Sequence, residues 1–338
     1  MQKIRYVAIE YGQAGFEPHK AEDTFKNKYG DCKDKAILLI TMLKEAGLSA
    51  WPVLISTNDY YNLEEDFPSV AFNHAIAAIP VGQDTIFMDG TAEVCAFGDI
   101  PSGDQKRKVL VFKEDGFQIM ETPLFSPEHN LLRQALKVKI NNDETISGEK
   151  SIFSLGRFDQ GQRYWLLYTQ PELIRQTLQE TVQKISIGSK LINYKIENLD
   201  DLNTPVVLNY AFSGPEYLTP AGSLRIMPQL ASLDISAVAL EKRKYPIYFD
   251  VLDTYELVYE FEIPSNFRVK YLPQAAKEEN GWQAISVEYA QKNNKIIFKQ
   301  KIETRKNFIP EGEYQAFKNF YEVIAKKIKQ RVVLEKTK

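Results

Sequence analysis

The sequence contains little cysteine and histidine, and it has no long apolar run. Its 338 residues include two cysteines, Cys32 and Cys95, and three histidines, His19, His74 and His129. Two cysteines exclude a disulfide-stabilised scaffold and a four-cysteine zinc site. No run of about 18 apolar residues is present, so we expect no membrane-spanning helix. The first residues also lack the apolar core of a signal peptide.

The charge of the chain is nearly balanced, with 42 Lys and Arg against 45 Asp and Glu. This balance removes any general argument for nucleic acid or an anionic membrane surface, and we expect no nucleic-acid partner. Hydrophobic residues make up 44% of the chain, which is enough to build a core. The length is typical of two domains.

The pattern of secondary structure changes near residues 121–130. Helix and strand patterns alternate before this point, and strand patterns with turn signals dominate after it. We therefore expect a first domain at residues 1–126 and a β-rich accessory region at residues 127–338. A further boundary near residues 245–250 is an open alternative.

The β-rich region shows both strand and helix periodicity. Alternating apolar and polar residues predict strands at 256–263 and 295–302, and apolar residues at helical spacing predict helices at 171–185 and 313–331. Pro171 suits the first turn of its helix, because the missing N–H has no helical partner there. We expect a sandwich-like region with two helices.

The clearest helix of the first domain begins at Cys32. Asp31 is a good N-cap residue, Asp34 places a second negative charge in the first turn, and Gly47 marks the end of the apolar pattern. Free N–H groups at a helix N-terminus stabilise a thiolate, so this position favours a reactive cysteine. The alternative is a small buried residue that begins the helix.

His74 lies in a strand pattern that a turn at residues 80–84 separates from a second strand pattern ending at Asp89. A turn centred between Val81 and Gly82 would make His74 and Asp89 direct cross-strand neighbours, with Cβ atoms about 4.5–5.5 Å apart. A slip of one residue would put them on opposite faces. An aspartate in this place can hold an imidazole in one tautomer, or the pair can simply close the hairpin.

The other cysteine and the other histidines have simpler interpretations. His19 follows a proline at the start of a short helix pattern, which indicates a capping or packing role. His129 lies in the loop at the expected domain boundary and is expected at the surface. Cys95 has no acid or base nearby in the sequence and is expected to pack.

Four ordered motifs within residues 1–95 give the chain a family resemblance. They are Tyr-Gly-Asp-Cys-Lys-Asp-Lys-Ala (29–36), Leu-Lys-Glu-Ala-Gly-Leu-Ser-Ala-Trp-Pro-Val (43–53), Asn-His-Ala (73–75) and Met-Asp-Gly-Thr (88–91), with Phe-Glu-Pro-His-Lys-Ala-Glu-Asp (16–23) upstream. The chain resembles the transglutaminase-like superfamily, a branch of the papain-like thiol enzymes found in many bacterial multidomain proteins. The resemblance implies an α+β fold with a papain/transglutaminase-like core, in which the nucleophile helix packs on an antiparallel sheet.

The resemblance also implies the roles of three residues. Cys32 corresponds to the nucleophile, His74 to the general base and acid, and Asp89 to the group that orients His74. A thiol enzyme needs donors for the oxyanion of its tetrahedral intermediate. The backbone N–H of Cys32 is the natural first donor, and we expect the Gln13 side chain as the second, although Gln13 can equally be an ordinary polar loop residue. No cofactor and no metal ligand set is expected.

We therefore predict a cysteine peptidase or amidase that acts on a protein or peptide substrate through a Cys32 thioester. A protein-glutamine transglutaminase is one alternative, and a non-catalytic module that binds protein or glycan on the same fold is another. Related bacterial proteins usually carry an N-terminal β-domain behind an export signal. The resemblance thus implies a periplasmic or cell-surface location, and a chain that opens within a strand pattern is expected to be cut from a longer protein.

Overall fold

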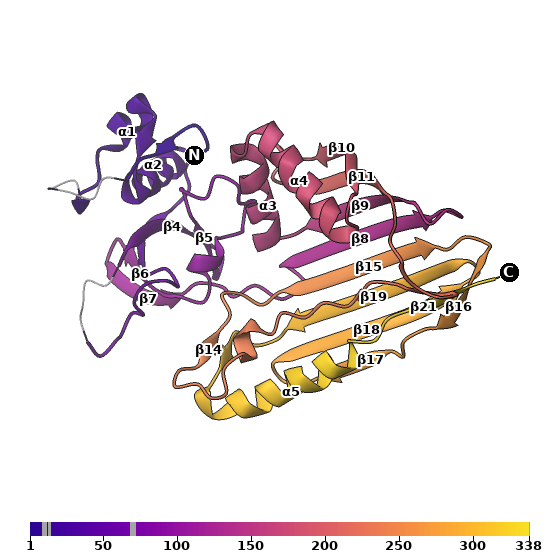
Figure 1. Ribbon diagram of the computed structural model, residues 1–338. Coiled ribbons are helices and arrows are strands. Elements are labelled where there is room, and N and C mark those ends of the chain that lie inside the picture. Colours follow the sequence, from indigo (N-terminus) through magenta and orange to yellow (C-terminus); the bar gives the residue numbers. More distant parts are fainter. Residues whose placement is uncertain (9–11, 13–14, 68–71, 338) are drawn as a thin grey trace. The chain divides into compact units, whose positions relative to one another are not determined.

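The computed structural model describes residues 1–8, 12, 15–67 and 72–337. The chain divides into two compact units, Met1–Phe125 (unit 1) and Ser126–Lys338 (unit 2). The described residues form five α-helices and five sheets. The fold is therefore mixed α+β, as Figure 1 shows. None of these helices combines the length and the apolar character that crossing a membrane requires.

Unit 1 is built around one five-stranded antiparallel sheet with the strand order β5-β4-β3-β6-β7. Its described elements are β1 (Arg5–Tyr6), α1 (Ala21–Asn27), β2 (Tyr29–Gly30), α2 (Cys32–Glu45), β3 (Trp51–Ile55), β4 (His74–Val81), β5 (Asp84–Met88), the short 3-10 helix η2 (Ser102–Asp104), β6 (Lys108–Lys113) and β7 (Gly116–Glu121). A short parallel pairing joins β1 to β2 immediately before α2.

Helix α2 begins and ends where the sequence predicts. The Asp31 carboxylate accepts the Asp34 N–H, the Asp34 carboxylate accepts the Asp31 N–H, and together they form a capping box. Its apolar stripe packs on strand β4, where Ile40 joins Ala77 and Ile79 in one buried cluster. The opposite face of the sheet has its own core, so β4 is covered on both sides. The first turn of α2 is thereby held beside the strand that carries His74.

The β4–β5 hairpin differs from the predicted register by two residues. Val81 pairs with Asp84 across a loop of Gly82 and Gln83, and the last pair is Ala77 with Met88. Gly82 has φ +63, a conformation that glycine adopts without strain. The predicted direct pairing of His74 with Asp89 is therefore wrong. A shift of two residues preserves the face on which each side chain lies, whereas a shift of one would have reversed it.

Unit 2 contains an eight-stranded sheet with the strand order β10-β11-β9-β8-β15-β19-β18-β17. Its strands are β8 (Leu131–Ile140), β9 (Ile146–Ser154), β10 (Lys190–Glu197), β11 (Val207–Gly214), β15 (Thr254–Glu262), β17 (Ala276–Glu279), β18 (Gln283–Lys292) and β19 (Lys295–Thr304). All pairings are antiparallel except that of β8 with β15. Strands from both sides of residues 245–250 thus belong to one sheet.

Smaller elements complete unit 2. They are a four-stranded sheet of β12 (Thr219–Ala221), β13 (Leu224–Ile226), β21 (Val333–Lys336) and β16 (Phe267–Tyr271), the pair β14 (Ile247–Tyr248) and β20 (Phe308–Ile309), the helices α3 (Arg157–Tyr168), α4 (Pro171–Ile185) and α5 (Tyr314–Lys327), and the 3-10 helices η3 (Ser236–Val238) and η4 (Glu311–Glu313). One face of the large sheet forms the main core with residues of α4, α5 and the four-stranded sheet. Figure 1 shows α4 beside β10 and α5 along β17.

The expectation of a sandwich-like region with two helices requires correction. Helix α4 has the predicted bounds, α5 ends four residues before the predicted end, and α3 is an additional helix. Helices and a small sheet, rather than a second large sheet, cover the apolar face. Helix α3 lacks a clear apolar stripe, because its buried residues are Asp159, Arg163 and Leu166. A periodicity based on apolar residues therefore does not detect it.

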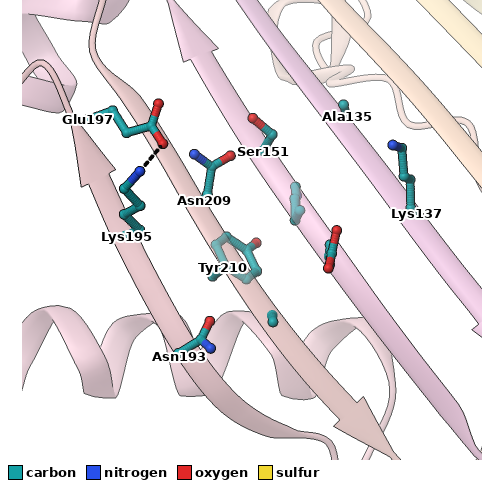
Figure 2. A pocket seen from close by; sticks show the side chains of 11 residues that line it. Ala135, Lys137, Ser151, Asn193, Lys195, Glu197, Asn209 and Tyr210 are labelled. Carbon is teal, nitrogen blue, oxygen red and sulfur yellow. Dashed lines mark hydrogen bonds and ion pairs between the residues drawn. The ribbon is translucent and has the colours of Figure 1, made fainter.

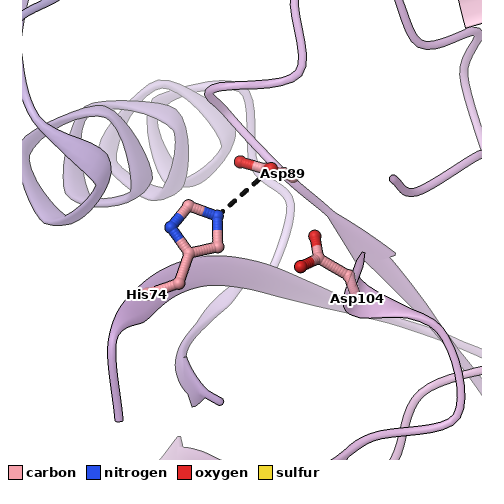
Figure 3. Close-up of side chains that lie close together, drawn as sticks. All are labelled: His74, Asp89 and Asp104. Carbon is pink, nitrogen blue, oxygen red and sulfur yellow. Dashed lines mark ion pairs between the residues drawn. The ribbon is translucent and has the colours of Figure 1, made fainter. Parts of the chain in front are cut away.

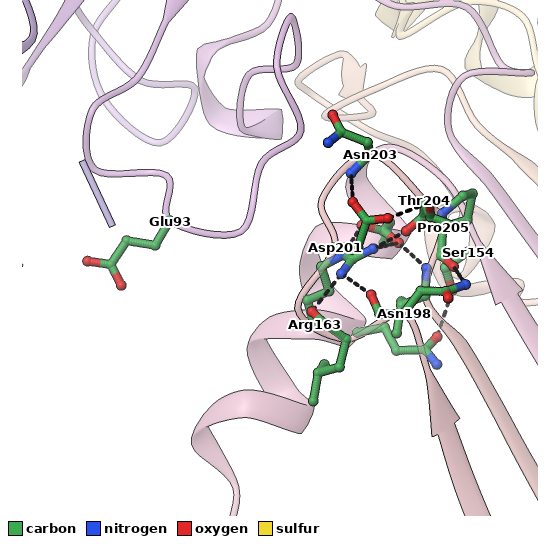
Figure 4. A network of polar contacts seen from close by, with 12 residues as sticks. Glu93, Ser154, Arg163, Asn198, Asp201, Asn203, Thr204 and Pro205 are labelled. Atoms are coloured by element: carbon green, nitrogen blue, oxygen red, sulfur yellow. Dashed lines mark hydrogen bonds and ion pairs between the residues drawn. The ribbon is translucent and has the colours of Figure 1, made fainter. Parts of the chain in front are cut away.

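The buried side of α3 is held by a polar network around Arg163, which is fully buried. Its guanidinium donates to the Asp159 carboxylate at 2.6 and 3.3 Å and to the backbone carbonyls of Asn198, Leu199 and Thr204. Asp159 also accepts the Val206 N–H at 2.7 Å. Figure 4 shows how this network joins α3 to the β10–β11 connection. A buried charge is tolerated here because it is paired and its donors are satisfied.

Candidate active site

His74 and Asp89 lie at neighbouring strand ends in unit 1. His74 is the first residue of β4, and Asp89 directly follows β5. The His74 Nε2 atom is 3.2 Å from Asp89 Oδ2, and the exposed fractions of the two side chains are 14% and 4%. Figure 3 shows the imidazole edge directed at the carboxylate. The two-residue shift in register thus leaves the predicted contact in place, although the residues are not directly opposite one another.

Thr91 fixes the orientation of the Asp89 carboxylate. Its backbone N–H and its hydroxyl each donate to Asp89 Oδ1 at 2.7 Å, and the hydroxyl is also 2.9 Å from Oδ2. Hydrogen bonds of this kind between an aspartate and the residue two positions later are typical of an Asx-turn. The Asp-Gly-Thr sequence therefore holds a carboxylate in one position beside His74.

Two glycines lie next to α2, and only one of them is in a contact too close for a side chain. A Cβ atom at Gly90 would lie 3.4 Å from the backbone carbonyl atoms of Lys35 in α2, and a Cβ at Gly30 would lie 2.6 Å from Asp34 Cβ. Neither glycine is needed for an unusual φ. Gly30 provides room for the Asp34 side chain in the first turn of α2, whereas a side chain at Gly90 would be in ordinary van der Waals contact with α2.

His19 contributes to the same helix terminus. Its backbone N–H donates to Asp34 Oδ1 at 2.7 Å, and its Nδ1 atom is 3.1 Å from Asp34 Oδ2. Asp34 is almost fully buried, so these contacts help to satisfy its charge. The structure therefore gives His19 a partner in the capping box of α2, which fits the capping or packing role expected for it.

Cys32 is the first residue of α2 and is partly buried. A hydrogen bond between its thiol and the His74 side chain is one of the causes that raise the pKa of His74. Because His74 Nε2 faces Asp89, we expect the other ring nitrogen, Nδ1, to serve the thiol. The structure thus brings the three predicted residues into one chain of contacts that runs from thiol to imidazole to carboxylate.

The surroundings of His74 favour its protonated form. Burial alone would lower the pKa of His74, but the hydrogen bonds to Asp89 and Cys32 and the negative charges of Asp89 and Asp104 raise it to about 10. For Asp89 burial acts in the opposite direction, yet the hydrogen bond and charge of His74 and the donors of Thr91 hold its pKa below the usual value. An imidazolium paired with a carboxylate is therefore the expected state at neutral pH.

Asp104 is a further acid at this site that the sequence analysis did not identify. It ends η2 and is 2% exposed, and its Oδ2 atom has no hydrogen-bond partner among the described residues. Burial and the negative charge of Asp89 raise the pKa of Asp104 to about 7, although His74 acts against this shift. The Pro-Ser-Gly-Asp segment has the composition of an ordinary turn, so no local signal separates Asp104 from a surface aspartate.

The remaining predicted positions add little to the site. Gln13 lies outside the described residues. Cys95 is partly buried, and neither Cys95 nor Cys32 forms a disulfide. The Cys32 N–H belongs to the first turn of α2, where backbone donors have no acceptor within the helix. It is therefore suited to receive an oxyanion.

Unit 2 has a polar hollow of about 480 Å³ on the face of its large sheet opposite the main core. Its lining includes Lys137, Glu149, Asn193, Lys195 and Asn209 from β8, β9, β10 and β11. Figure 2 shows Lys137, Asn193, Lys195 and Asn209 on neighbouring strands of the sheet, with an ion pair between Lys195 and Glu197. Polar residues alternate here with core residues of the opposite face, as in a sheet with one solvated side.

The raised pKa of His74 predicts a pH dependence of stability. A histidine with a folded pKa near 10 and an ordinary value of 6.5 contributes stability that is fully present below pH 6.5 and lost as the pH rises through 10. One pKa unit corresponds to about 1.4 kcal/mol, so the loss is on the order of a few kcal/mol. Urea unfolding between pH 6 and 10 should show this decline, and His74→Gln should flatten it. If the decline in the free energy of unfolding is unchanged in His74→Gln but absent in His129→Gln, its assignment to His74 is wrong.

Comparisons with known proteins place this geometry in context. A family described as "Domain of Unknown Function with solved-structure structure (DUF3858)" matches residues 224–334 in unit 2. The chain is similar to a crystal structure of a "putative protease" from Parabacteroides distasonis, with a TM-score of 0.56 and 13% identity. That match covers 99% of this chain and 49% of the other, so the chain spans about half the length of that protein. At this identity the likeness shows a shared fold.

The other comparisons add no functional information. A crystal structure of baculovirus P35 has 7% identity and a TM-score of 0.14, with coverage of 61% of this chain and 96% of that chain. A TM-score at this level carries no structural argument. No curated protein matches the chain in sequence.

Proposed function

We propose that unit 1 is a thiol acyl-transfer enzyme, a cysteine peptidase or amidase that acts on a protein or peptide substrate. One observation carries the proposal: the imidazole of His74 contacts the Cys32 thiol on one side and the buried Asp89 carboxylate on the other. Each of the three groups is held by local structure, namely a capped helix, a strand and an Asx-turn. The fold shared with the Parabacteroides distasonis protein supports the same class of activity.

In the proposed acylation step, the Cys32 thiolate attacks the carbonyl carbon of an amide. The carbonyl electron pair moves to oxygen, and the N–H of Cys32 at the helix N-terminus is placed to stabilise that oxyanion. Collapse of the intermediate breaks the carbon–nitrogen bond, and protonated His74 transfers its proton to the departing amine. The products of this step are a Cys32 thioester and neutral His74.

In the second step His74 acts as a base. It takes a proton from water, whose oxygen attacks the thioester carbon and expels the Cys32 thiolate, so that the acid is released and His74 is again protonated. Asp89 holds the imidazole in the orientation that both steps need. An amine in place of water would give a transglutaminase. Hydrolysis requires no second binding site and is the form that we propose.

A non-catalytic binding role is the second candidate, and the polar hollow of unit 2 favours it. Hydroxyl, amide and charged side chains on one sheet face can form hydrogen bonds with a glycan or a protein segment. In this case Cys32, His74 and Asp89 would only stabilise the fold of unit 1. The two candidates differ in one measurable property, which is the reactivity of the Cys32 thiol.

Alkylation by iodoacetamide at pH 7 tests the proposal. An ordinary cysteine is only a few per cent thiolate at this pH, and a neighbouring imidazolium stabilises the thiolate form. We expect His74→Ala to slow Cys32 alkylation about tenfold, because the higher intrinsic nucleophilicity of a more basic thiolate offsets part of the loss. Peptide mass spectrometry can follow Cys32 and Cys95 in the same sample.

Cys95 provides the internal control for this experiment. Its alkylation rate should be the same in the wild type and in His74→Ala, since it has no part in the proposed triad. Equal and slow labelling of Cys32 in both proteins would overturn the proposed function and leave the binding role.

A further inference from the structure

His74, Asp89 and Asp104 place three metal-ligating atoms close together in the interior of unit 1. One ligand atom from each residue lies within 4.8 Å of the other two. Figure 3 shows both carboxyl groups on the same side of the imidazole ring. Asp104 is 98% buried by its exposed fraction of 2%, and its Oδ2 atom has no hydrogen-bond partner among the described residues. We propose that these three residues form a binding site for a zinc ion, which switches off the thiol chemistry of Cys32.

The unpartnered oxygen of Asp104 is the observation that points to a ligand. Leaving a buried polar atom without a partner costs about 1–3 kcal/mol. Thr91 and His74 satisfy the Asp89 carboxylate. Its negative charge repels the buried Asp104 carboxyl, and the charge of His74 offsets this repulsion only in part. A cation between the two carboxylates removes the repulsion and gives Asp104 a partner.

The geometry fits a small divalent ion. Zinc–nitrogen and zinc–oxygen bonds of about 2.0–2.2 Å place neighbouring ligand atoms of a tetrahedral site roughly 3.4 Å apart. His74 Nε2 and Asp89 Oδ2 are already 3.2 Å apart. The Asp104 ligand atom lies within 4.8 Å of both, and a shift of this side chain would break no hydrogen bond at Oδ2.

The donor set favours zinc over the alkaline-earth ions. One imidazole nitrogen and two carboxylate oxygens leave a fourth position for water, as in zinc sites with three protein ligands. Magnesium and calcium prefer sites built only from oxygen ligands. Two carboxylates and a neutral imidazole also balance the charge of Zn²⁺, while the proton of the His74 imidazolium is released on binding.

Zinc at this position would block the proposed role of His74. A metal on Nε2 leaves the remaining ring proton on Nδ1, the nitrogen that faces Cys32. A ring in this state can donate to the thiolate but cannot accept another proton, so it can serve neither as the acid nor as the base. This inhibitory effect rests on the proposed function, whereas zinc binding itself does not. The site also differs from a zinc ion bridging Cys32 and His74, because the thiol is not among its ligands.

Cobalt titration of the purified full chain tests the site, because Co²⁺ replaces Zn²⁺ in such sites and is visible in absorption spectra. We expect one equivalent of Co²⁺ to give the visible bands of four-coordinate cobalt without a thiolate-to-cobalt charge-transfer band, and added Zn²⁺ to remove them. Asp104→Asn should weaken binding at least tenfold. Asp104→Glu keeps the carboxylate and should bind within about tenfold of the wild type.

Two variants serve as controls in the titration. Cys32→Ser should bind Co²⁺ as the wild type does, and Asp84→Asn, at the far end of β5, should do the same. Far-UV circular dichroism without metal establishes whether each variant is folded. If Asp104→Asn is unfolded, cobalt binding is compared between the wild type, Asp104→Glu and Cys32→Ser instead. The proposed site would be overturned by unchanged cobalt binding in folded Asp104→Asn or by loss of binding in Cys32→Ser. A thiolate-to-cobalt charge-transfer band, or no cobalt binding to the wild type, would also overturn it.

Iodoacetamide labelling separates this proposal from the proposed function. Zinc should slow Cys32 alkylation in the wild type but not in Asp104→Asn. A reactive Cys32 that ignores zinc would refute the metal site and leave the thiol enzyme intact. Cobalt binding to a chain whose Cys32 is unreactive would support the metal site and refute the enzyme.

Discussion

Substitution of Asp89 by Asn is expected to slow acylation of Cys32 by p-nitrophenyl acetate by about 10²- to 10³-fold. General acid–base catalysis contributes about 10²–10⁴-fold in enzymes, and it requires the imidazole in the correct tautomer. The Asp89 carboxylate favours a proton on Nε2 and so leaves Nδ1 to serve Cys32. An asparagine amide that donates to Nε2 favours the opposite tautomer, and it also removes the charge that keeps the pKa of His74 high.

Release of p-nitrophenolate in a single turnover measures this effect, with Cys32→Ala providing the background rate. Asp84→Asn is the matched control, because it makes the same chemical change at the exposed end of the same hairpin. Thr91→Val should give an intermediate rate, since it removes the hydroxyl donor to Asp89 but keeps the backbone donor. An Asp89→Asn protein that is acylated within a factor of two of the wild type would mean that Asp89 only closes the hairpin.

The contact between His74 and Asp89 could be predicted although the hairpin register could not. The turn composition located the loop approximately. Which two residues form the loop depends on the positive φ that Gly82 adopts. The error of two residues left side-chain faces unchanged, because strand periodicity is also two. The contact therefore depends mainly on which face of the sheet each side chain occupies, and the apolar pattern of β4 specifies that face. It depends less on the exact pairing of residues.

Helix α2 was predictable because its signals are local. Its N-cap and its C-terminal glycine lie within the helix or next to it, and the capping box forms between residues three positions apart. The contact of Cys32 with His74 has no local signal. It follows from the packing of Ile40 on Ala77 and Ile79, which only the tertiary structure defines.

Asp104 and helix α3 were missed for a common physical reason. Each depends on a buried polar group, and burial of a polar residue is not visible in a pattern of apolar residues. Asp104 follows a turn and becomes buried beside residues 15 and 30 positions away in the chain, and α3 buries Asp159 and Arg163 in place of an apolar stripe. Both the burial of Asp104 and the packing of α3 depend on residues that are distant in the sequence.

Arg163→Met is expected to lower the free energy of unfolding of unit 2 by about 3–5 kcal/mol. Removing one partner of a buried ion pair leaves the other charge uncompensated, and this is the main cost. Among the described residues, Asp159 would keep the Val206 N–H as its one remaining donor, and three backbone carbonyls would lose the Arg163 donor. Methionine has a similar length, so the loss reports charge and hydrogen bonding rather than a large cavity.

The double variant Asp159→Asn/Arg163→Met tests this cause. Asparagine can still accept from Val206 but carries no charge, so the double variant should be more stable than Arg163→Met alone. Arg133→Met is the control: Arg133 pairs with Glu256 at 2.7 Å with a side chain that is 48% exposed, and such pairs contribute about 0–1 kcal/mol. Urea unfolding of the full chain, followed by tryptophan fluorescence and circular dichroism, measures these three variants and the single variant Asp159→Asn. Strictly additive losses at Asp159 and Arg163 would show that the uncompensated charge is not the origin of the instability, and equal losses at Arg133 and Arg163 would show that burial of the network contributes nothing.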